Sequence, residues 1–281
     1  MIQPRIATPN AAIASHYDDL APFYLRMWGE HIHHGYWLDG GESHVEAVER
    51  LAQVVVDTAR LPRGGRAVDI GCGFGGTARR MAGQREAEVV GVTISAAQVR
   101  AAREQTPAEL RVDYRLGDWL TIDLPAASFD AAVAIETTQH IGDLDGFIDR
   151  CRRVLRPGGR VIISTFLATS HPRPWQERHL LEPICRESCL QAIHTAEEHQ
   201  AALGGHGFDD IEVRDITRHV TRTWTLSMLR SARATVTDRE FRSKLFDPTF
   251  TNRAFAWTMF RFVAAYRTGA LRYAIVSATK R

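Results

Sequence analysis

The sequence predicts an α/β fold, in which helices cover both faces of a doubly wound and mostly parallel sheet. Short apolar runs alternate with amphipathic stretches from Arg66 onward, which is typical of successive strand–helix–strand units. A glycine-rich segment, "VDIGCGFGGTA" at 68–78, stands where the first of these strands would turn into a helix. The 281 residues suffice for one large core domain with added cap segments, and are too few for three domains.

The composition excludes several classes of protein. Lys and Arg total 35 against 33 Asp and Glu, without a block of like charge, so we expect no nucleic-acid partner. The N-terminus lacks a signal-peptide pattern, and no run of about 18 apolar residues could span a bilayer. We therefore expect a cytoplasmic protein without membrane contacts. The four cysteines are too scattered for a disulfide framework.

The N-terminal part, residues 1–61, is expected to form a helical lid. Apolar residues recur at helical spacing over 10–28 and 43–60, which predicts two helices. The glycine-rich and aromatic segment "HIHHGYWLDGG" joins them. Both helices are expected to lie over the carboxyl edge of the sheet.

The core domain is expected over 62–170. Its predicted strands are "RAVDI" at 66–70, "AEVVGV" at 87–92, "FDAAVAI" at 129–135 and "RVIISTF" at 160–166. A helix ending near Leu155 is expected to reverse into the last of these strands through a sharp turn at Pro157, Gly158 and Gly159.

The remainder, 171–281, completes the core and adds a cap. Prolines after Ser170 predict an irregular segment, followed by a helix at 196–203, a turn at "GGHGF" and a strand at 211–216. A mostly helical stretch at about 219–266 is too long for a loop. We interpret it as a helical substrate cap inserted before the last strand, "LRYAIVSATK".

The glycine loop fits two patterns. Gly71, Gly73 and Gly76 match a dinucleotide-binding pattern, and Gly71, Gly73 and Gly75 match a second one. A dinucleotide enzyme needs an acidic residue about 20 positions further on, but Thr93 stands at that place. Asp69 precedes the loop, and a carboxylate there suits a ligand with an amino group and no pyrophosphate.

On these residues the sequence resembles the class I S-adenosylmethionine-dependent methyltransferases. "VDIGCGFGGTA" is similar to their first motif, whose glycines pass under the methionine and ribose part of the cofactor. "GVTISAAQV" at 91–99 resembles the tocopherol methyltransferase and cyclopropane-synthase-like branch, which implies cofactor contacts from Thr93, Ile94 and Gln98. "RVLRPGGRVIIS" resembles the helix and turn before the fifth strand.

This resemblance implies a Rossmann-like, seven-stranded sheet and the cofactor S-adenosylmethionine, with S-adenosylhomocysteine as product. "GDW" at 117–119 is similar to the segment in which an Asp accepts from the adenine amino group and an aromatic residue packs on the base. Asp118 and Trp119 would take these roles.

Catalytic candidates follow the strand at 129–135, because ligands of such sheets lie at the carboxyl ends of the strands. The segment "ETTQHIGD" contains Glu136 and, about one helical turn later, His140. Methyl transfer mainly needs alignment and the exclusion of water, and His140 is the candidate base for a protonated nucleophile. Glu136 could orient His140, hold the cofactor's methionine end or stabilise a positive charge on the substrate.

The histidine-rich segment "EHIHHGYW" at 30–37 first suggests a metal site. Three imidazoles from so short a loop would be sterically awkward ligands, so no metal is expected. The resemblance instead implies that Tyr17 and Tyr36 reach the methionine carboxylate of the cofactor, that Trp37 walls the site and that His33 belongs to the lid. His31 and His34 have no such counterpart, and a solvated loop is expected for both.

The predicted function is methylation of O, C or N on a largely apolar small molecule of specialised metabolism. One alternative is C-methylation of a double bond in a prenyl diphosphate or lipid, and another is a cofactor-binding protein without catalysis. A monomer and a homodimer both stay open. The cap supplies apolar residues that could line a pocket and arginines that could hold a diphosphate; they are Trp175, Trp224, Met228, Phe241, Phe246, Phe250, Phe255, Trp257, Phe260 and Phe262, with Arg222, Arg230, Arg233, Arg253 and Arg261.

Overall fold

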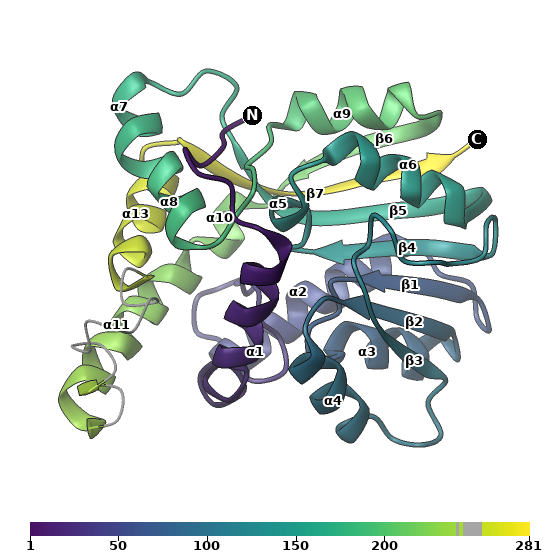
Figure 1. Cartoon of the computed structure of the whole chain (residues 1–281), viewed down its shortest axis with the longest axis horizontal. Helices are drawn as coiled ribbons and strands as arrows, with labels where there is room; N and C mark the ends of the chain where they lie inside the picture. Colours follow the sequence, from purple (N-terminus) through teal and green to yellow (C-terminus); the bar gives the residue numbers. More distant parts are fainter. Residues whose placement is uncertain (240–241, 244–254) are drawn as a thin grey trace.

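The computed structural model describes residues 1–239, 242–243 and 255–281. Within them a seven-stranded sheet has the strand order β3-β2-β1-β4-β5-β7-β6 (Figure 1). β1 to β5 pair in parallel, and β7 is antiparallel to both β5 and β6. The α/β class and the mostly parallel sheet are confirmed. The strands are β1 Arg66–Ile70, β2 Glu88–Thr93, β3 Val112–Leu116, β4 Phe129–Ile135, β5 Leu155–Ala168, β6 Phe208–Asp215 and β7 Leu271–Lys280.

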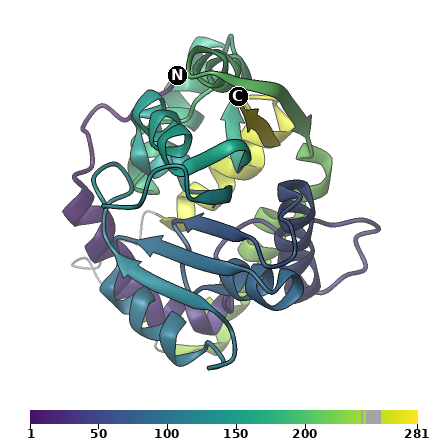
Figure 2. The ribbon, with the colours of Figure 1, turned by 90° about the vertical axis from the view of Figure 1, so that its right-hand side faces the viewer.

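Helices cover both faces of this sheet (Figure 2). Alternate strand residues point to opposite sides, so Ala67 and Val133 join one core and Val68 and Ala134 the other. The first core is covered by α2 His44–Ala59, α3 Gly76–Arg85 and α4 Ala96–Glu104. The second is covered by α6 Leu144–Val154 and α9 Ala196–Gly205.

The two N-terminal helices are confirmed as α1 Asn10–Met27 and α2. The expectation that both lie over the carboxyl edge of the sheet is wrong for α2, which packs on one face of the sheet, whereas α1 lines the cavity at that edge. A capping box starts α2: Ser43 Oγ accepts from the Glu46 N–H, and the Glu46 carboxylate accepts from the Ser43 N–H. α1 packs on α4, where Asp18 Oδ1 accepts from Ser95 Oγ at 2.6 Å and from the Ala97 N–H at 2.9 Å. The first helix is thereby fixed beside the carboxyl end of β2.

Two segments differ from the prediction. The edge strand β3 was not identified, because its exposed side places charged residues between Val112, Tyr114 and Leu116. The proline-rich segment expected to be irregular forms α7 Pro174–Gln176, the π-helical turn η1 Glu177–Leu181 and α8 Glu182–Glu187. Pro174 stands in the first turn of α7, where a missing N–H costs nothing. Pro183 stands in the first turn of α8, which continues directly from η1.

Two boundaries also differ. β5 begins at Leu155, so the predicted turn at Pro157, Gly158 and Gly159 lies in its irregular first part, where the register with β4 shifts. α9 continues to Gly205 and takes up two residues of the turn expected at "GGHGF".

The cap contains α10 Thr217–Val220, α11 Arg222–Thr237 and α13 Phe255–Arg267, which precede β7 as predicted. Four expected cap residues, Phe241, Phe246, Phe250 and Arg253, lie outside the described residues, as do the side chains of Phe255 and Trp257. None of the helices in the described part of the chain has the length and apolarity needed to cross a membrane.

Candidate active site

A cavity of roughly 1020 Å³, partly open to solvent, lies at the carboxyl ends of β1, β2 and β4. α1 contributes Asn10, Ile13 and Tyr17 to its wall, and the following loop contributes residues 30–33. Most of the predicted cofactor residues line this cavity: Tyr17, Asp69, Gly71, Gly73, Thr93, Ile94, Gln98, Asp118 and Trp119, together with Glu136, His140 and His33.

The glycine loop leaves space for a ligand at Gly73. A Cβ added there would meet no atom within 4 Å, and its φ of +54° favours glycine. At Gly71, with φ +71°, a Cβ would lie 2.2 Å from Thr137 Oγ1. Gly75, expected to contact the cofactor, does not line the cavity; it caps α3 and packs against Tyr114.

Asp69 presents an unpaired carboxylate oxygen to the cavity. The side chain is buried, and Oδ2 has no hydrogen-bond partner among the described residues. Burial raises the pKa of Asp69 to about 7, against a smaller opposite effect of the Ala78 backbone. A ligand ammonium group would satisfy Oδ2 and restore the ionised form.

Thr93 and Gln98 form a hydrogen-bonded pair on the neighbouring wall. Thr93 Oγ1 donates to Gln98 Oε1 at 2.6 Å, which directs the Gln98 amide group. Its Nε2 has no partner among the described residues, so the amide N–H groups remain available to a hydroxyl oxygen of a ligand.

Asp118 and Trp119 line the far end of the cavity. Asp118 Oδ2 accepts from Asn10 Nδ2 at 2.6 Å, and Oδ1 accepts from the Leu120 N–H at 2.9 Å. Trp119 is buried, and its Nε1 donates to the Phe147 carbonyl at 3.4 Å. Asn10 is the first residue of α1, so this contact ties the N-terminal helix to the cavity wall.

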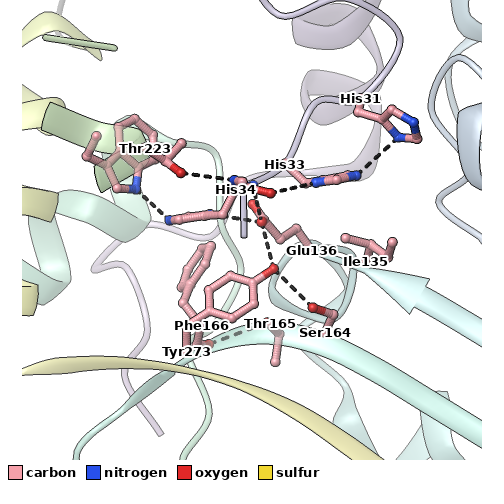
Figure 3. A network of polar contacts seen from close by, with 12 residues as sticks. His31, His33, His34, Ile135, Glu136, Ser164, Thr165, Phe166, Thr223 and Tyr273 are labelled. Atoms are coloured by element: carbon pink, nitrogen blue, oxygen red, sulfur yellow. Dashed lines mark hydrogen bonds and ion pairs between the residues drawn. The ribbon is translucent and has the colours of Figure 1, made fainter. Parts of the chain in front are cut away.

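Glu136 follows β4 and forms the centre of a buried network (Figure 3). Its Oε1 accepts from the His34 N–H at 2.7 Å, from His34 Nδ1 at 2.8 Å and from the Tyr273 hydroxyl at 2.8 Å. Ser164 Oγ in turn donates to the Tyr273 hydroxyl oxygen at 3.2 Å. Oε2 accepts from no described residue, so one carboxylate oxygen is fixed and the other remains available.

Two further properties distinguish Glu136. Burial alone would raise its pKa, but the interactions with His34 hold the pKa below the usual value, so Glu136 is ionised at pH 7. Its φ of +51° lies in the left-handed region that non-glycine residues seldom adopt. Such strain persists where surrounding contacts determine the conformation, and here three donors do so.

The hydrogen-bond partners of His34 distinguish its two ring nitrogens. The Trp224 Nε1–H can only donate, and it points to His34 Nε2 at 2.7 Å. Nε2 is therefore the acceptor, and the Nδ1–H donates to Glu136. The expectation of a solvated loop is wrong for His31 and His34, which are 4% and 1% exposed.

His33 and His31 continue the loop as a hydrogen-bonded pair (Figure 3). His33 Nδ1 donates to the His34 carbonyl at 2.8 Å, and its Nε2 lies 3.2 Å from His31 Nδ1. Burial lowers the pKa of His33 to about 3 and that of His31 to about 4. Both rings are neutral at pH 7, and both line the cavity described above.

Tyr36 and Trp37 do not lie where the resemblance implied. The Tyr36 ring stacks on His219, with centroids 4.3 Å apart. Trp37 is buried, and its Nε1 donates to Thr223 Oγ1 at 3.2 Å. Neither side chain lines a described cavity of the site; both instead fasten the loop to the cap.

His140 is held with one nitrogen free to accept. Its Nδ1 lies 3.1 Å from the Cys189 carbonyl, which can only accept, so Nδ1 carries the proton. Nε2 lies 3.0 Å from the Tyr17 hydroxyl and accepts from it. Burial lowers the pKa of His140 to about 4 and raises that of Tyr17, so at pH 7 both groups are neutral.

A second cavity of about 600 Å³, including space open to solvent and here called the acceptor cavity, adjoins the first. Both cavities share Tyr17, Ile32, His33, Glu136 and His140. Its other walls are largely aromatic, and the Trp224 and Phe262 rings stack with centroids 4.1 Å apart. Those walls are His16, Tyr24, Trp28, His34, Gln139, Phe166, Ser188, Leu190, Trp224 and Phe262.

One set of possible metal ligands occurs among the described residues, formed by Glu30, His31 and Glu49. Arg79 forms an ion pair with Glu30, and Arg80 forms one with Glu49. The two carboxylates are thus already neutralised by protein cations.

The chain is similar to a protein family model, to the sequences of known proteins and to solved structures. The model of the methyltransferase domain family matches residues 68–163. The 27-O-demethylrifamycin SV methyltransferase of Amycolatopsis mediterranei (strain S699) is 33% identical over 222 residues, covering 78% of this chain and 80% of the relative. The chloroplastic tocopherol O-methyltransferase of Arabidopsis thaliana is 27% identical over 289 residues, covering 95% and 81%.

Among solved structures, the geranyl diphosphate C-methyltransferase from Streptomyces coelicolor A3(2) matches with a TM-score of 0.75. It is 22% identical, and the match covers 99% of this chain and 100% of that one. That structure is a complex with Mg²⁺, geranyl-S-thiolodiphosphate and S-adenosyl-L-homocysteine. At this identity the likeness concerns the fold alone.

Proposed function

This chain belongs to the class I S-adenosylmethionine-dependent methyltransferases, and from that premise we propose that it methylates a hydroxyl oxygen of an apolar, ring-containing small molecule. The family membership makes it an enzyme that uses S-adenosylmethionine to methylate small molecules. The nature of the acceptor atom is our proposal. It rests on the junction of two cavities at His140.

The residues that line the first cavity fit the cofactor. The unpaired Asp69 Oδ2 suits the methionine ammonium group, and the loop at Gly71 and Gly73 admits a ligand against its backbone. The free Gln98 amide group suits a ribose hydroxyl. We assign to Asp118, which lines the same cavity, the role of accepting from the adenine amino group. Bound there, the cofactor supplies an electrophilic methyl group.

His140 is the proposed base. Its Nε2 is an acceptor in the wall shared by both cavities. Nε2 would take up the hydroxyl proton, directly or through the Tyr17 hydroxyl. The bound cofactor would supply the methyl group to the hydroxyl oxygen, with its sulfur as the leaving atom that keeps the electron pair. A neutral imidazole accepts the proton without prior deprotonation.

Glu136 would stabilise the imidazolium that this transfer produces. Its carboxylate is ionised and raises the pKa of His140 against the effect of burial. The two side chains share both cavity walls. Burial leaves little water to weaken their attraction.

The walls of the acceptor cavity support an apolar substrate that contains a ring. The stacked rings of Trp224 and Phe262, together with the ring of Phe166, which meets Phe262 edge-to-face, form an aromatic wall against which an apolar ring can pack. We therefore assign the acceptor to hydroxylated aromatic or terpenoid compounds.

The test is methyl transfer to a panel of phenols and hydroxylated terpenoids, using S-adenosylmethionine with an isotopically labelled methyl group. For any acceptor found, we expect kcat to fall about 10²–10⁴-fold in His140→Gln and about tenfold in Tyr17→Phe. Tyr24→Phe is the matched control, because Tyr24 lines only the acceptor cavity; its change should appear in KM.

Binding of S-adenosylhomocysteine should persist in His140→Gln, which separates a lost base from a damaged cofactor site. An unchanged kcat in His140→Gln at saturating substrates would remove this residue from the reaction.

A second candidate is C-methylation of a double bond. It is favoured by the ionised Glu136, whose Oε2 has no described partner, beside aromatic faces that can stabilise a carbocation. The position of the labelled methyl group in the product, on carbon or on oxygen, decides between the two candidates.

A further inference from the structure

A third cavity lies outside the site described above, between the end of α1, the start of α2 and α11. We call it the arginine groove. Its volume is about 980 Å³, including space open to solvent. It is lined by Leu25, Trp28, Gly29, His44, Val45, Arg230, Arg233, Ala234, Thr237 and Asp238.

The charges of the arginine groove are mainly positive. Arg230 and Arg233 are three residues apart on α11 and so share one face of it. Neither guanidinium forms an ion pair or a hydrogen bond with a described residue. Asp238 is the single acidic residue among the lining residues, so the two cations exceed the carboxylate charge that faces them.

His44 adds an unsatisfied buried group to this wall. It is the first residue of α2 and 4% exposed, and both ring nitrogens lack a hydrogen-bond partner. Burial, and secondarily Arg230, lower its pKa to about 4, so the ring is neutral at pH 7 and carries one N–H donor. Buried donors in folded proteins are normally paired, which points to a partner that binds in the groove.

The start of α2 reinforces the preference for an anion. The first N–H groups of a helix lack acceptors within the helix, and this end carries a partial positive charge. The capping box satisfies the Ser43 and Glu46 N–H groups. His44 and Val45, the next residues at this helix end, both line the groove.

Trp28 lies between the arginine groove and the acceptor cavity, because it is the one residue that lines both. Its ring meets His44 edge-to-face at 5.1 Å, and it meets Trp224, a wall of the acceptor cavity, at 6.2 Å. A ligand that fills the acceptor cavity and passes Trp28 would reach the two arginines.

We propose that the arginine groove binds a phosphate or diphosphate group at the far end of the acceptor, whose apolar part fills the acceptor cavity. This inference rests on the proposed function for the identity of the acceptor, and it holds whether oxygen or carbon receives the methyl group. A phosphate suits the site because its oxygens can accept from both guanidinium groups, from His44 and from the first turn of α2.

The first test measures binding of inorganic pyrophosphate by NMR, through the ring resonances of His44, assigned by loss of the signal in His44→Gln. Sodium chloride at equal ionic strength is the control for screening. We expect a saturable shift with pyrophosphate and none with chloride. Equal shifts with both salts would overturn the proposal.

Variants then locate the site. Arg230→Gln and Arg233→Gln should each weaken pyrophosphate binding about tenfold or more, because each removes a charge-assisted contact. Arg267→Gln is the matched control, since Arg267 is an exposed arginine of the cap that lines none of the three cavities. Equal losses in all three variants would contradict a localised site.

The link to the acceptor is tested by calorimetry with octyl phosphate and 1-octanol. Octyl phosphate should bind at least tenfold more tightly than both octanol and pyrophosphate, and the advantage over octanol should vanish in the Arg230→Gln/Arg233→Gln double variant. No advantage over octanol would overturn the proposal. None of these measurements requires turnover, so a failure of methyl transfer with intact phosphate binding would count against the proposed function alone.

Discussion

Two carboxylates of the site, those of Glu136 and Asp69, differ in their hydrogen bonding. Three donors converge on Glu136 Oε1, whereas Asp69 Oδ2 is buried without one. A carboxylate oxygen that accepts from three donors is held in place, whereas a buried oxygen without a donor can accept from a ligand group. Substitutions at Asp69 and at His34, one of the donors to Glu136, test this contrast.

Asp69→Asn should weaken binding of S-adenosylhomocysteine by about 1.5–3 kcal/mol at pH 8, the usual value of a hydrogen bond to a charged group. In the unsubstituted protein the affinity should also rise with pH up to about pH 7. The reason is that the pKa of Asp69 is raised to about 7, so at lower pH the carboxyl must lose a proton before it can pair with an ammonium group. Calorimetry at several pH values measures both effects.

The matched control for this experiment is Asp113→Asn. Asp113 is an exposed carboxylate of β3 that pairs with Arg115 and does not line the cavity. It should leave both the affinity and its pH dependence unchanged. The same pH dependence in Asp69→Asn as in the unsubstituted protein would show that another group is responsible.

His34→Leu should lower the free energy of unfolding by about 2–4 kcal/mol. The change removes a donor from the buried carboxylate of Glu136 and takes an acceptor from Trp224 and Tyr266. Urea unfolding measures the loss. His179→Leu, at an exposed histidine, should change stability by no more than about 0.5 kcal/mol; similar losses at both positions would contradict the role given to His34.

Whether a residue of the site could be predicted from the sequence depends on how far away its partners lie along the chain. Asp69, Gly71 and Gly73 lie in one short motif, so their place at the cavity could be predicted from spacing. The partners of Glu136 could not, because His34 is 102 residues before it and Tyr273 is 137 residues after it. Only the fold brings these polar groups together, and nothing in the local pattern marks them.

Secondary-structure elements position the site through their ends. The capping box at Ser43 fixes the start of α2, and with it His44 and the arginine groove. Asp18 holds α1 to the start of α4. These contacts set where two helices begin or dock, and therefore where their side chains lie.

Ser43→Ala should lower the free energy of unfolding by about 1 kcal/mol, because the Glu46 N–H loses its acceptor. Ser43→Gly should cost only a few tenths of this amount, roughly 0.3 kcal/mol, because glycine lets water reach the helix end. Urea unfolding of both variants gives the comparison. Equal stability of Ser43→Ala and the unsubstituted protein would show that the cap contributes nothing measurable.

At the scale of elements, the sequence predicted those with strong periodicity and missed those whose identity depends on neighbours. The buried strands and the helices α1 and α2 follow from their apolar patterns. β3 was missed because an edge strand buries little of its surface, and Tyr114 alone among its residues is fully buried. α7 and α8 were missed because proline excludes the interior of a helix but not its first turn.

Several histidines of the molecule are buried and neutral at pH 7. Burial lowers the pKa values of five of them to between about 3 and about 4: His31, His33, His44, His140 and His199. An unfolded chain protonates its histidines near pH 6.5. Between pH 6.5 and 4 the unfolded state therefore binds more protons than the folded state, and acid favours unfolding.

Stability should accordingly fall as the pH drops from 6.5 to 4, by up to about 1.4 kcal/mol per pH unit for each of these groups. Asp69 acts in the opposite direction over this range, but it is one group against five. The urea midpoint measured across this range tests the prediction. His199→Phe, a replacement outside the site, should reduce the slope; an identical slope in this variant would contradict the contribution of the ring.

β7 follows all the other strands along the chain, yet it lies between β5 and β6 and supplies Tyr273 to Glu136. A ribosome that synthesises the chain from its N-terminus therefore exposes β6 before the strand that pairs with it. A nascent chain can already contain the complete glycine loop while the Glu136 carboxylate still lacks the Tyr273 hydroxyl, one of its three donors. The site of this enzyme is therefore complete only once β7 has paired with β5 and β6.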